Sequence, residues 1–309
     1  MFQLQLCVTY NDAVISQPPL NQSTFQIEST AEEADQKLVR HTLHCIKEEY
    51  TDIEIQSIDY DVLILLLAYV ATTMESSDNS NHTNIFFKLI TPNPTWYNVK
   101  FLIKELGTDI CKALPFFYAF TGCDTVPSFS GKGKCTFWDH WMKSEMKDDI
   151  TRTFIKLGSM PVSVNSDDTL ALEQLVKSVY YGGTKNFSHT LLNVLRERQF
   201  RQSTSNDMRK IAPCSDALHM QALRAIHTAG FEWVECIRNV VPPDPRVRGY
   251  IMKDSVYVPK WLPNPPEFDL QVFLQTCKCK TAICKSCKCA QLGIPCLPLC
   301  HCNKTCKRV

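Results

Sequence analysis

The feature that most constrains this chain is a pair of carboxylates placed directly before its most apolar run. Asp59 and Asp61 precede Val62–Ala71, a segment in which every residue is hydrophobic. A charge beside such a segment costs free energy unless a partner or a ligand offsets it. The preceding residues alternate polar and apolar and predict a buried strand, which is carried by Ile53, Ile55 and Ile58. The pattern therefore predicts a strand that ends at Asp59 and a core helix that begins just after it.

Two interpretations of this carboxylate pair stay open from the stretch alone. In the first, Asp59 caps the helix and Asp61 complements the helix dipole. In the second, both side chains lie at the carboxyl end of a parallel strand, where α/β sheets form their sites. The apolar run is only about ten residues long, which is too short to span a bilayer, so we expect no membrane association.

The charge of the chain is distributed unevenly along its length. The chain of 309 residues is long enough for two domains or for one domain with additions, and its net charge is +1. From Cys277 to the end there are seven Lys or Arg residues and no acidic residue, so the preceding part is net acidic. A basic tail on an acidic body indicates a polyanionic partner, and we expect DNA.

Cysteine is concentrated in the same tail. Nine of the 16 cysteines lie there, at Cys277, Cys279, Cys284, Cys287, Cys289, Cys296, Cys300, Cys302 and Cys306. Three tetrahedral Zn²⁺ ions need twelve ligand positions, which nine thiolates supply if three of them bridge. A segment this short has too few apolar residues to fold by burial alone. Disulfides are disfavoured because nine is odd and because the first residues lack the features of a signal peptide, which indicates the nucleus or the cytosol.

The expected elements follow from periodicity and turn residues. A hairpin is expected between Phe2 and Ile15, and a strand at Ile85–Ile90. Helices are expected at about 30–50, 99–106, 109–120, 167–179, 189–200 and 215–230, with one more starting near Trp138. Residues 120–134 contain too many turn residues for a regular element. Residues 242–266, with seven prolines, are interpreted as a connector over the surface with a short strand near Tyr250–Val258.

Five carboxylates stand at the ends of expected elements, namely Glu33, Asp35, Asp59, Asp61 and Asp124. Mg²⁺ and Mn²⁺ prefer such oxygen ligands. Two of these ions held about 4 Å apart bind both the attacking and the leaving oxygens in phosphodiester hydrolysis. On a regular helix Glu33 and Asp35 point about 200° apart. Both can therefore face one site only if Glu33 precedes the first turn, and otherwise Glu32 takes its place.

Three short motifs in this order resemble the acidic signature of the flap-endonuclease branch of PIN-like nucleases: Glu33-Ala34-Asp35, Asp59-Tyr60-Asp61 and Gly122-Cys123-Asp124. They resemble still more closely a group of transposon-associated proteins, over roughly residues 25 to 145. The resemblance implies a parallel sheet with flanking helices and makes the five carboxylates ligands of Mg²⁺ or Mn²⁺. It also implies that the turn Gly131, Lys132, Gly133 and Lys134 holds a DNA backbone through amides and lysines.

The chain departs from both families in ways that bear on activity. Flap nucleases contribute an Asp from a first strand, and no residue before Glu28 fits that ligand. Tyr60 stands where the transposon-associated group has Thr. An active nuclease and an inactive scaffold of the same fold therefore both remain open.

The cysteine spacing of the tail resembles the CXC domain of tesmin-like DNA-binding proteins. Such domains place a Tyr before the second C-x-C pair, whereas Ser286 precedes Cys287 here. The resemblance implies zinc binding. The departure leaves open a purely structural zinc knot or a protein-docking module.

Together these features predict an α/β chain with three parts: a PIN-like domain over 1–150, a helical extension with its connector over 151–270, and a zinc domain over 277–306. We expect a metal-dependent nuclease-like protein of transposon origin that acts on or binds DNA, in the nucleus in preference to the cytosol. The alternative is a catalytically inactive PIN-like scaffold that binds DNA or a protein partner.

Overall fold

The structure of the chain is a computed structural model. It describes residues 6–10, 13–17, 34–76, 82–159, 163–182, 190–202, 211–234 and 243–262. The described chain is a mixed α/β fold that is mainly helical.

A three-stranded mixed sheet stands at the amino-terminal end of the helical part, with the order β3-β4-β5. β3 (Asp52–Ser57) and β4 (Asn84–Leu89) run parallel, with Ile53 opposite Ile85. β5 (Thr95–Asn98) runs antiparallel to β4. The expectation of a parallel sheet is therefore correct for one strand pair and wrong for the other. Residues 90–94 are too few for the crossover of about a dozen residues that a parallel neighbour needs.

The strand before the carboxylate pair shows the predicted alternation of buried and exposed side chains, except that Ile58 does not belong to its buried side. Ile53 and Ile55 are buried, and Ser57 is the third inward residue of β3. Ile58 was expected to be buried but is 79% exposed, because the strand ends at Ser57 and the alternation turns the next side chain outward. The predicted core helix follows as α2 (Tyr60–Ser76), and Val62 to Ala71 contain almost only buried residues.

The predicted helices are present, with shifted ends. They are α1 (Ala34–Lys47), α3 (Val99–Leu106), α4 (Thr108–Phe120), α5 (Lys134–Met142), α7 (Ser166–Tyr181), α8 (Leu192–Gln202) and α9 (Ser215–His227). A further helix, α6 (Lys147–Gly158), was not predicted from the sequence. A π-helix, η4 (Thr228–Glu232), continues α9 directly. The largest shift is at α5, which begins at Lys134 rather than near Trp138, so this lysine belongs to a helix and not to the preceding loop.

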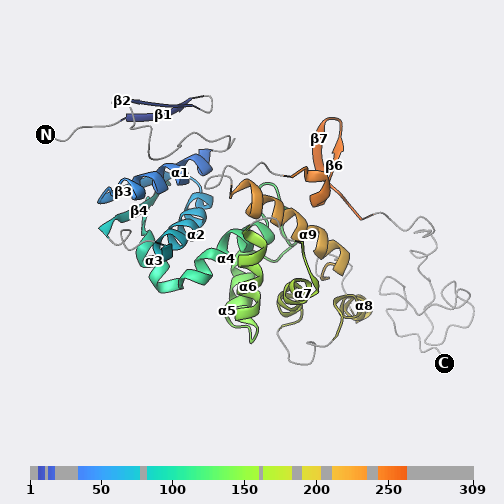
Figure 1. The fold of residues 1–309 in the computed structure, drawn as a ribbon. Helices are drawn as coiled ribbons and strands as arrows, with labels where there is room; N and C mark the ends of the chain where they lie inside the picture. Colours follow the sequence, from blue (N-terminus) through green and yellow to red (C-terminus); the bar gives the residue numbers. More distant parts are fainter. Residues whose placement is uncertain are drawn as a thin grey trace, which may run out of the picture.

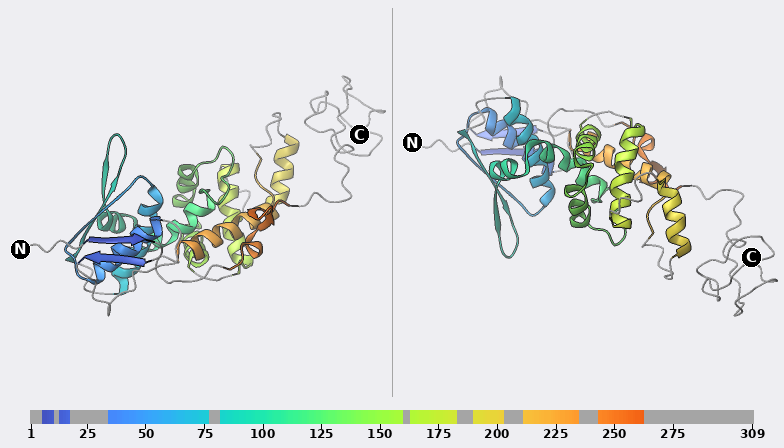
Figure 2. Two further views of the ribbon diagram at one scale, coloured as in Figure 1. Left: turned by 90° about the horizontal axis from the view of Figure 1, so that it is seen from above. Right: turned by 90° about the horizontal axis from the view of Figure 1, so that it is seen from below.

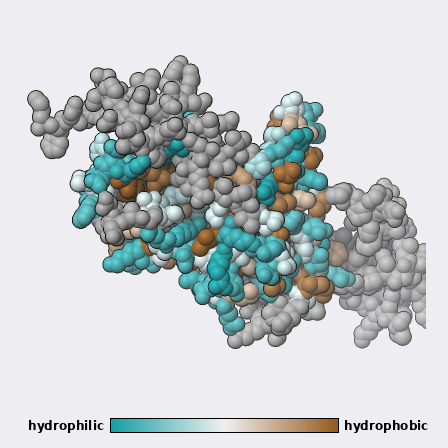
Figure 3. Space-filling model, viewed as in Figure 1, coloured by the Kyte–Doolittle hydropathy of each residue, from teal (hydrophilic) through white to brown (hydrophobic). Residues whose placement is uncertain are grey.

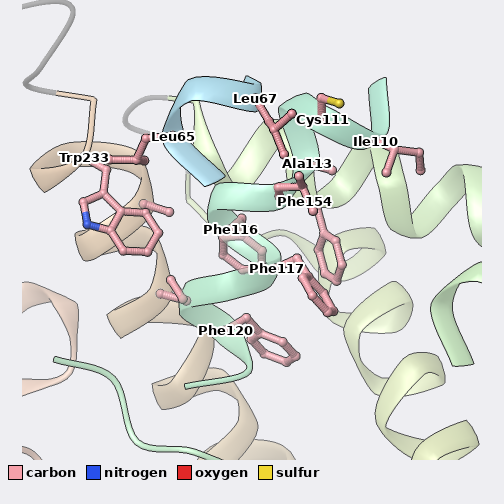
Figure 4. Packing of buried hydrophobic residues seen from close by; sticks show 14 of the residues in the cluster. Leu65, Leu67, Ile110, Cys111, Ala113, Phe116, Phe117, Phe120, Phe154 and Trp233 are labelled. Carbon is pink, nitrogen blue, oxygen red and sulfur yellow. The ribbon is translucent and has the colours of Figure 1, made fainter. Parts of the chain in front are cut away.

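The hydrophobic core is centred on α4, which lies between the sheet end of the molecule and helices α6 and α9 (Figure 1). Figure 4 shows Phe116, Phe117 and Phe120 of α4 beside Phe154 of α6. The ring centres of Phe116 and Phe154 are 5.4 Å apart, and all four phenylalanine side chains are buried. The core therefore runs through residue 150, where a domain boundary was expected from the sequence.

Two hairpins complete the described chain. β1 (Leu6–Tyr10) and β2 (Ala13–Gln17) pair antiparallel, which confirms the predicted amino-terminal hairpin. A short 3-10 helix, η5 (Pro245–Arg248), leads into a second hairpin of β6 (Tyr250–Lys253) and β7 (Val256–Pro259). The sequence predicted one strand here. The chain instead reverses at Asp254 and Ser255, which both have positive φ, as a tight two-residue turn requires.

The molecule is elongated, with the sheet toward one end and α8 toward the other (Figure 2). The hairpin of β6 and β7 projects from the side of α9 (Figure 1) and carries both hydrophilic and hydrophobic residues on its surface (Figure 3). None of the described helices is both long and apolar enough to cross a membrane.

Candidate functional site

Asp59 and Asp61 lie where the sequence predicts them, between the end of β3 and the first turn of α2. The Asp59 amide donates a hydrogen bond to Ser57 Oγ at 3.1 Å. Asp59 Oδ1 accepts a hydrogen bond from the Asp61 amide at 3.0 Å, which caps the start of α2. The capping interpretation is therefore confirmed for one oxygen of Asp59. Asp61 lies in the first turn of α2, where the dipole interpretation expects it, but its carboxylate also faces a second group of residues.

Asp61 is half-buried and close to other acidic groups. Burial raises its pKa to about 6, and the negative charges of Asp59 and Asp35 add to the increase. The Tyr118 hydroxyl of α4 donates a hydrogen bond to the Asp61 carboxylate, which opposes the increase only in part. Burial and the like charges beside it therefore both disfavour the ionised form of Asp61. Tyr118 is a neighbour of Asp61 that the sequence did not reveal.

Asp35 and Asp124 join the same acidic group from distant parts of the chain. Asp35 lies in the first turn of α1, and its pKa is raised by burial and then by the charges of Asp59 and Asp124. Asp124 is exposed on the loop between α4 and α5. Four of the five predicted carboxylates therefore lie close enough to interact. The fifth, Glu33, lies outside the described residues.

The loop that carries Asp124 is held in one conformation by a close backbone approach. Gly122 has φ +113°, and a Cβ placed on it would lie 2.6 Å from Cα of Ser128. The Cys123 amide donates to the Val126 carbonyl at 3.0 Å, which closes a tight turn around Asp124. The Gly-Cys-Asp motif thus requires glycine at its first position for a steric reason.

Lys134 points toward the carboxylates rather than outward from the loop. Its Nζ donates to the Gly122 carbonyl and lies 4.0 Å from the centre of the Tyr118 ring. Burial lowers the pKa of Lys134, and the nearby charges of Cys123, Asp61 and Asp124 act against that decrease. Lys132 lies instead against the Tyr180 ring at 5.3 Å. The two lysines of the predicted phosphate-binding turn therefore have different surroundings.

The other members of that turn have structural roles. Gly131 has φ +69°, and Gly133 precedes the first residue of α5 as its N-cap. The backbone amides of the first turn of this helix are groups that bind phosphate in other proteins.

A cavity of about 800 Å³ opens beside the carboxylates. One wall contains Asp59, Asp61 and Asp124 with Lys134. The opposite wall comes from α9, η4 and the β6–β7 hairpin, through His227, Glu232, Tyr250 and Tyr257. No motif in the sequence indicates this second wall, because His227 and Glu232 lie at the end of a helix, and Tyr250 and Tyr257 lie in a proline-rich segment.

Hydrogen bonds hold α9 and the β6–β7 hairpin to the end of α4 and to the Asp124 loop. Gln221 Nε2 of α9 donates to the Phe120 carbonyl at 2.9 Å and to the Pro127 carbonyl at 2.5 Å. The Tyr250 hydroxyl donates to the Thr125 carbonyl at 3.0 Å. The two sides of the cavity are thus one cross-linked unit.

The chemistry of this group suits a hard divalent cation. The donors are carboxylate oxygens, and Lys134 is the Lys or Arg residue that lines the cavity with them. Within the part of the chain that the structure describes, no three His, Cys, Asp or Glu side chains converge to hold an ion. Mg²⁺ commonly takes only one or two carboxylates and keeps several waters, so this spacing fits it.

The predicted zinc ligands Cys277, Cys279, Cys284, Cys287, Cys289, Cys296, Cys300, Cys302 and Cys306 all lie outside the described residues. The zinc domain therefore stays a prediction.

The chain was compared with known families, proteins and structures. No family model matches it, and neither a curated protein nor a solved structure matches it. The resemblance to flap nucleases thus rests on the three acidic motifs.

Proposed function

We propose that this chain is a metal-dependent nuclease-like protein that acts on or binds DNA. One observation carries the proposal: carboxylates from three separate segments lie close together beside one cavity, and burial together with the neighbouring negative charges raises the pKa of Asp61 and of Asp35. The carboxylates are Asp35 from α1, Asp59 and Asp61 after β3, and Asp124 from the α4–α5 loop. Helix capping explains Asp59 and the helix dipole favours Asp61 in the first turn of α2, but neither explains why these two carboxylates lie near Asp35 and Asp124. A cluster that is unfavourable without a cation is what a divalent-cation site requires.

The residues have distinct parts in this proposal. Asp35, Asp59, Asp61 and Asp124, with Glu33 if it reaches the site, hold Mg²⁺ or Mn²⁺. The bound ions supply Lewis-acid activation of the phosphodiester and of water. Lys134 lies in the same cavity and is placed to contact a phosphate oxygen. The backbone amides at the start of α5, next to Gly131, Lys132 and Gly133, contact a neighbouring phosphate.

The zinc-cysteine tail adds affinity in this proposal. Its seven Lys and Arg residues, without an acidic residue, neutralise phosphates of DNA. Such a tail on a transposon-derived nuclease fold places the protein in the nucleus, where its DNA partner is.

A second function is favoured by two observations. No three potential ligands converge among the residues that the structure describes, and no Asp matches the first-strand ligand of flap nucleases. A fold of this kind that has lost catalysis serves as a scaffold that binds DNA or a protein. The two functions differ in what happens when the carboxylates are removed.

The test is cleavage of labelled single-stranded, duplex and flapped DNA by the purified zinc-loaded full chain with Mn²⁺. The test variant is Asp59→Asn/Asp61→Asn. The matched control is Asp139→Asn/Asp148→Asn, which removes the same charge from two exposed helical positions. We expect cleavage by the parent and the control. In the test variant we expect a loss of at least about a hundredfold, because ion-ligand interactions supply several kcal/mol to this reaction.

The other outcomes decide between the two functions. Cleavage that persists in Asp59→Asn/Asp61→Asn overturns the carboxylate site. An absence of cleavage, with salt-dependent DNA binding equal in parent and test variant, supports the scaffold and makes the tail the functional centre.

A further inference from the structure

Tyr257 is an exposed aromatic residue in the second wall of the cavity, opposite the carboxylates. It is 42% exposed and lines the cavity together with Asp59 and Asp61. Tyr250 of the same hairpin is only 8% exposed, and its hydroxyl already donates to the Thr125 carbonyl. Of these two tyrosines, Tyr257 is therefore the one that a ligand can reach without any rearrangement.

The register of the β6–β7 hairpin turns the Tyr257 side chain toward the cavity. Tyr250 pairs with Pro259, and Met252 pairs with Tyr257. Side chains two residues apart on a strand share a face, so these four residues lie on one face of the hairpin. Three of them, Tyr250, Tyr257 and Pro259, line the cavity. The residues of the other face do not line it, namely Ile251, Lys253, Val256 and Val258.

The two walls of the cavity differ in their chemistry. The carboxylates and Lys134 on the first wall suit cations and phosphate oxygens. The second wall adds flat, apolar surfaces, which are the rings of Tyr257, Pro245 and Pro259. A nucleotide has the same division, since a charged phosphate is joined through a sugar to a base with a π-face. The cavity of about 800 Å³ lies within the range of about 300–1,000 Å³ that is usual for ligand sites, so it has room for a nucleotide.

Both ends of the hairpin are fixed to α9, which holds Tyr257 in place relative to the first wall. Arg224 of α9 donates to the Gly249 carbonyl, just before β6, at 3.2 Å and to the Lys260 carbonyl, just after β7, at 2.9 Å. The Lys260 amide donates to the Gly249 carbonyl at 2.8 Å and closes the base of the hairpin. A ring that is fixed before binding lowers the entropic cost of placing a ligand against it.

We propose that Tyr257 stacks on a base of the nucleic acid whose phosphate lies at the carboxylates. The inference rests on the proposed function and names a residue that determines what the site accepts. The base must leave its own stack to make this contact, because neighbouring bases cover both of its faces in a duplex. Every base has a π-face, so stacking on Tyr257 does not depend on which base is bound. Tyr257 therefore distinguishes a strand with accessible bases from a bare sugar–phosphate chain, and it does not select a sequence.

Two substitutions separate the ring of Tyr257 from its hydroxyl. Tyr257→Phe keeps the ring, whereas Tyr257→Leu replaces it with an apolar side chain that cannot stack. The matched control is Tyr50→Leu, the same change at a residue that is 45% exposed and does not line the cavity. The zinc-loaded full chain of each protein is titrated, without Mn²⁺, with labelled oligothymidylate, oligodeoxyadenylate and an abasic deoxyribose-phosphate chain of equal length.

We expect Tyr257→Leu to bind both base-carrying probes at least about fivefold more weakly than the parent, the effect of one lost stacking contact. Tyr257→Phe and Tyr50→Leu should bind them within about twofold of the parent, and all four proteins should bind the abasic chain equally. Unchanged binding in Tyr257→Leu overturns the inference. An equal loss with the abasic chain, a loss confined to one base, or an equal loss in Tyr257→Phe also overturns it.

The same titrations separate a failure of this inference from a failure of the proposed function. If the parent binds the probes and the substitutions change nothing, the chain binds DNA but Tyr257 does not stack on it. If the parent binds none of the three probes, the proposed function fails as well. Cleavage is not measured, so the expected result does not depend on whether the chain is a nuclease or a scaffold.

A second measurement locates the contact in the parent sequence, because in the proposed function the basic tail also binds DNA. Iodouracil-substituted oligothymidylate is cross-linked to the full chain by ultraviolet light, and the tryptic peptides are identified by mass spectrometry. Cleavage after Lys253 and Lys260 leaves Tyr257 in a peptide of residues 254–260, in which it is the only aromatic residue. We expect a cross-link in this peptide. Cross-links confined to other peptides overturn the inference.

Discussion

The hydroxyl groups of Thr125 and Thr228 lie 2.8 Å apart, although 103 positions separate them in the sequence. Thr125 follows Asp124 in the acidic loop, and Thr228 follows His227 at the start of the π-helix. The hydrogen bond therefore joins the region that carries the acidic motifs to the second wall of the cavity, which contains no recognised motif. Consequently the cavity depends on residues after 211, and the motif-bearing region up to 145 supplies only one of its walls.

The first prediction concerns the pH dependence of stability without divalent cations. The pKa of Asp61 is raised from 3.8 to about 6 in the folded chain. The folded state therefore binds the proton more tightly, and its stability falls as the pH rises from about 4 to above 6. After allowance for solvent screening we expect a decrease of about 1–2 kcal/mol in the free energy of unfolding. Urea unfolding at a series of pH values measures it.

Asp61→Asn should reduce the pH dependence of the free energy of unfolding. Saturating Mn²⁺ should reverse part of the decrease in the parent, because a bound cation favours the ionised Asp61 carboxylate. Asp139→Asn, on the exposed face of α5, is the control that should keep the parental slope. A slope that is the same in Asp61→Asn and the parent would show that the pKa of Asp61 is not raised in the folded chain.

A second prediction tests the link between α9 and the acidic loop. Gln221→Ala removes the donor to the carbonyls of Phe120 and Pro127. We expect a loss of about 1–3 kcal/mol in the free energy of unfolding, because buried carbonyl groups lose a hydrogen bond. Gln56→Ala is the control, since its hydrogen bond to Glu54 is exposed and contributes little. Equal effects of the two substitutions in thermal unfolding would contradict the buried link.

A third prediction concerns the glycine of the acidic loop. Gly122→Ala combines an unfavourable positive φ with a Cβ only 2.6 Å from the Ser128 backbone. Gly107→Ala has the positive φ alone, with no atom within 4 Å of the new Cβ. We expect Gly107→Ala to cost about 1–3 kcal/mol and Gly122→Ala to cost clearly more. Chemical unfolding of both variants ranks them, and the reverse order would show that the loop does not make this close approach.

The sequence predicted the acidic half of the cavity for a physical reason. Charges before an apolar run are costly, so Asp59 and Asp61 stood out, and their place at the end of β3 is as expected. Ile58 was misassigned because it is apolar and adjoins the strand, although the alternation that buries Ile53, Ile55 and Ser57 turns the next side chain outward. β5 was missed because Pro92 and Pro94 look like the end of a strand and not like a return turn.

The second wall could not be predicted in the same way. His227, Tyr250 and Tyr257 share neither a helical nor a strand period, and they meet only because α9 packs on α4 and the β6–β7 hairpin folds beside it. Tertiary packing of distant segments leaves no local pattern. Lys134 is an intermediate case: its motif was recognised, but its inward direction depends on α5 beginning four residues earlier than Trp138 indicates.

A fourth prediction concerns the cysteine tail. If nine thiolates share three tetrahedral ions, the purified full chain contains about three zinc ions per molecule by elemental analysis. Cys300→Ser/Cys302→Ser should lower that number, while Cys135→Ser, at an exposed position of α5, should not. Intramolecular disulfides in the tail by mass spectrometry, together with a zinc content near zero, would contradict the zinc domain.

The most direct test of the central claim measures the binding of Mn²⁺ to the zinc-loaded full chain by isothermal titration calorimetry at pH 7. The account predicts saturable binding in the parent and in Asp139→Asn/Asp148→Asn, and its loss in Asp59→Asn/Asp61→Asn. It also predicts weaker binding as the pH falls below about 6, where Asp61 takes up a proton. Binding that is equal in all three proteins, or absent from the parent, would contradict a divalent-cation site at these carboxylates.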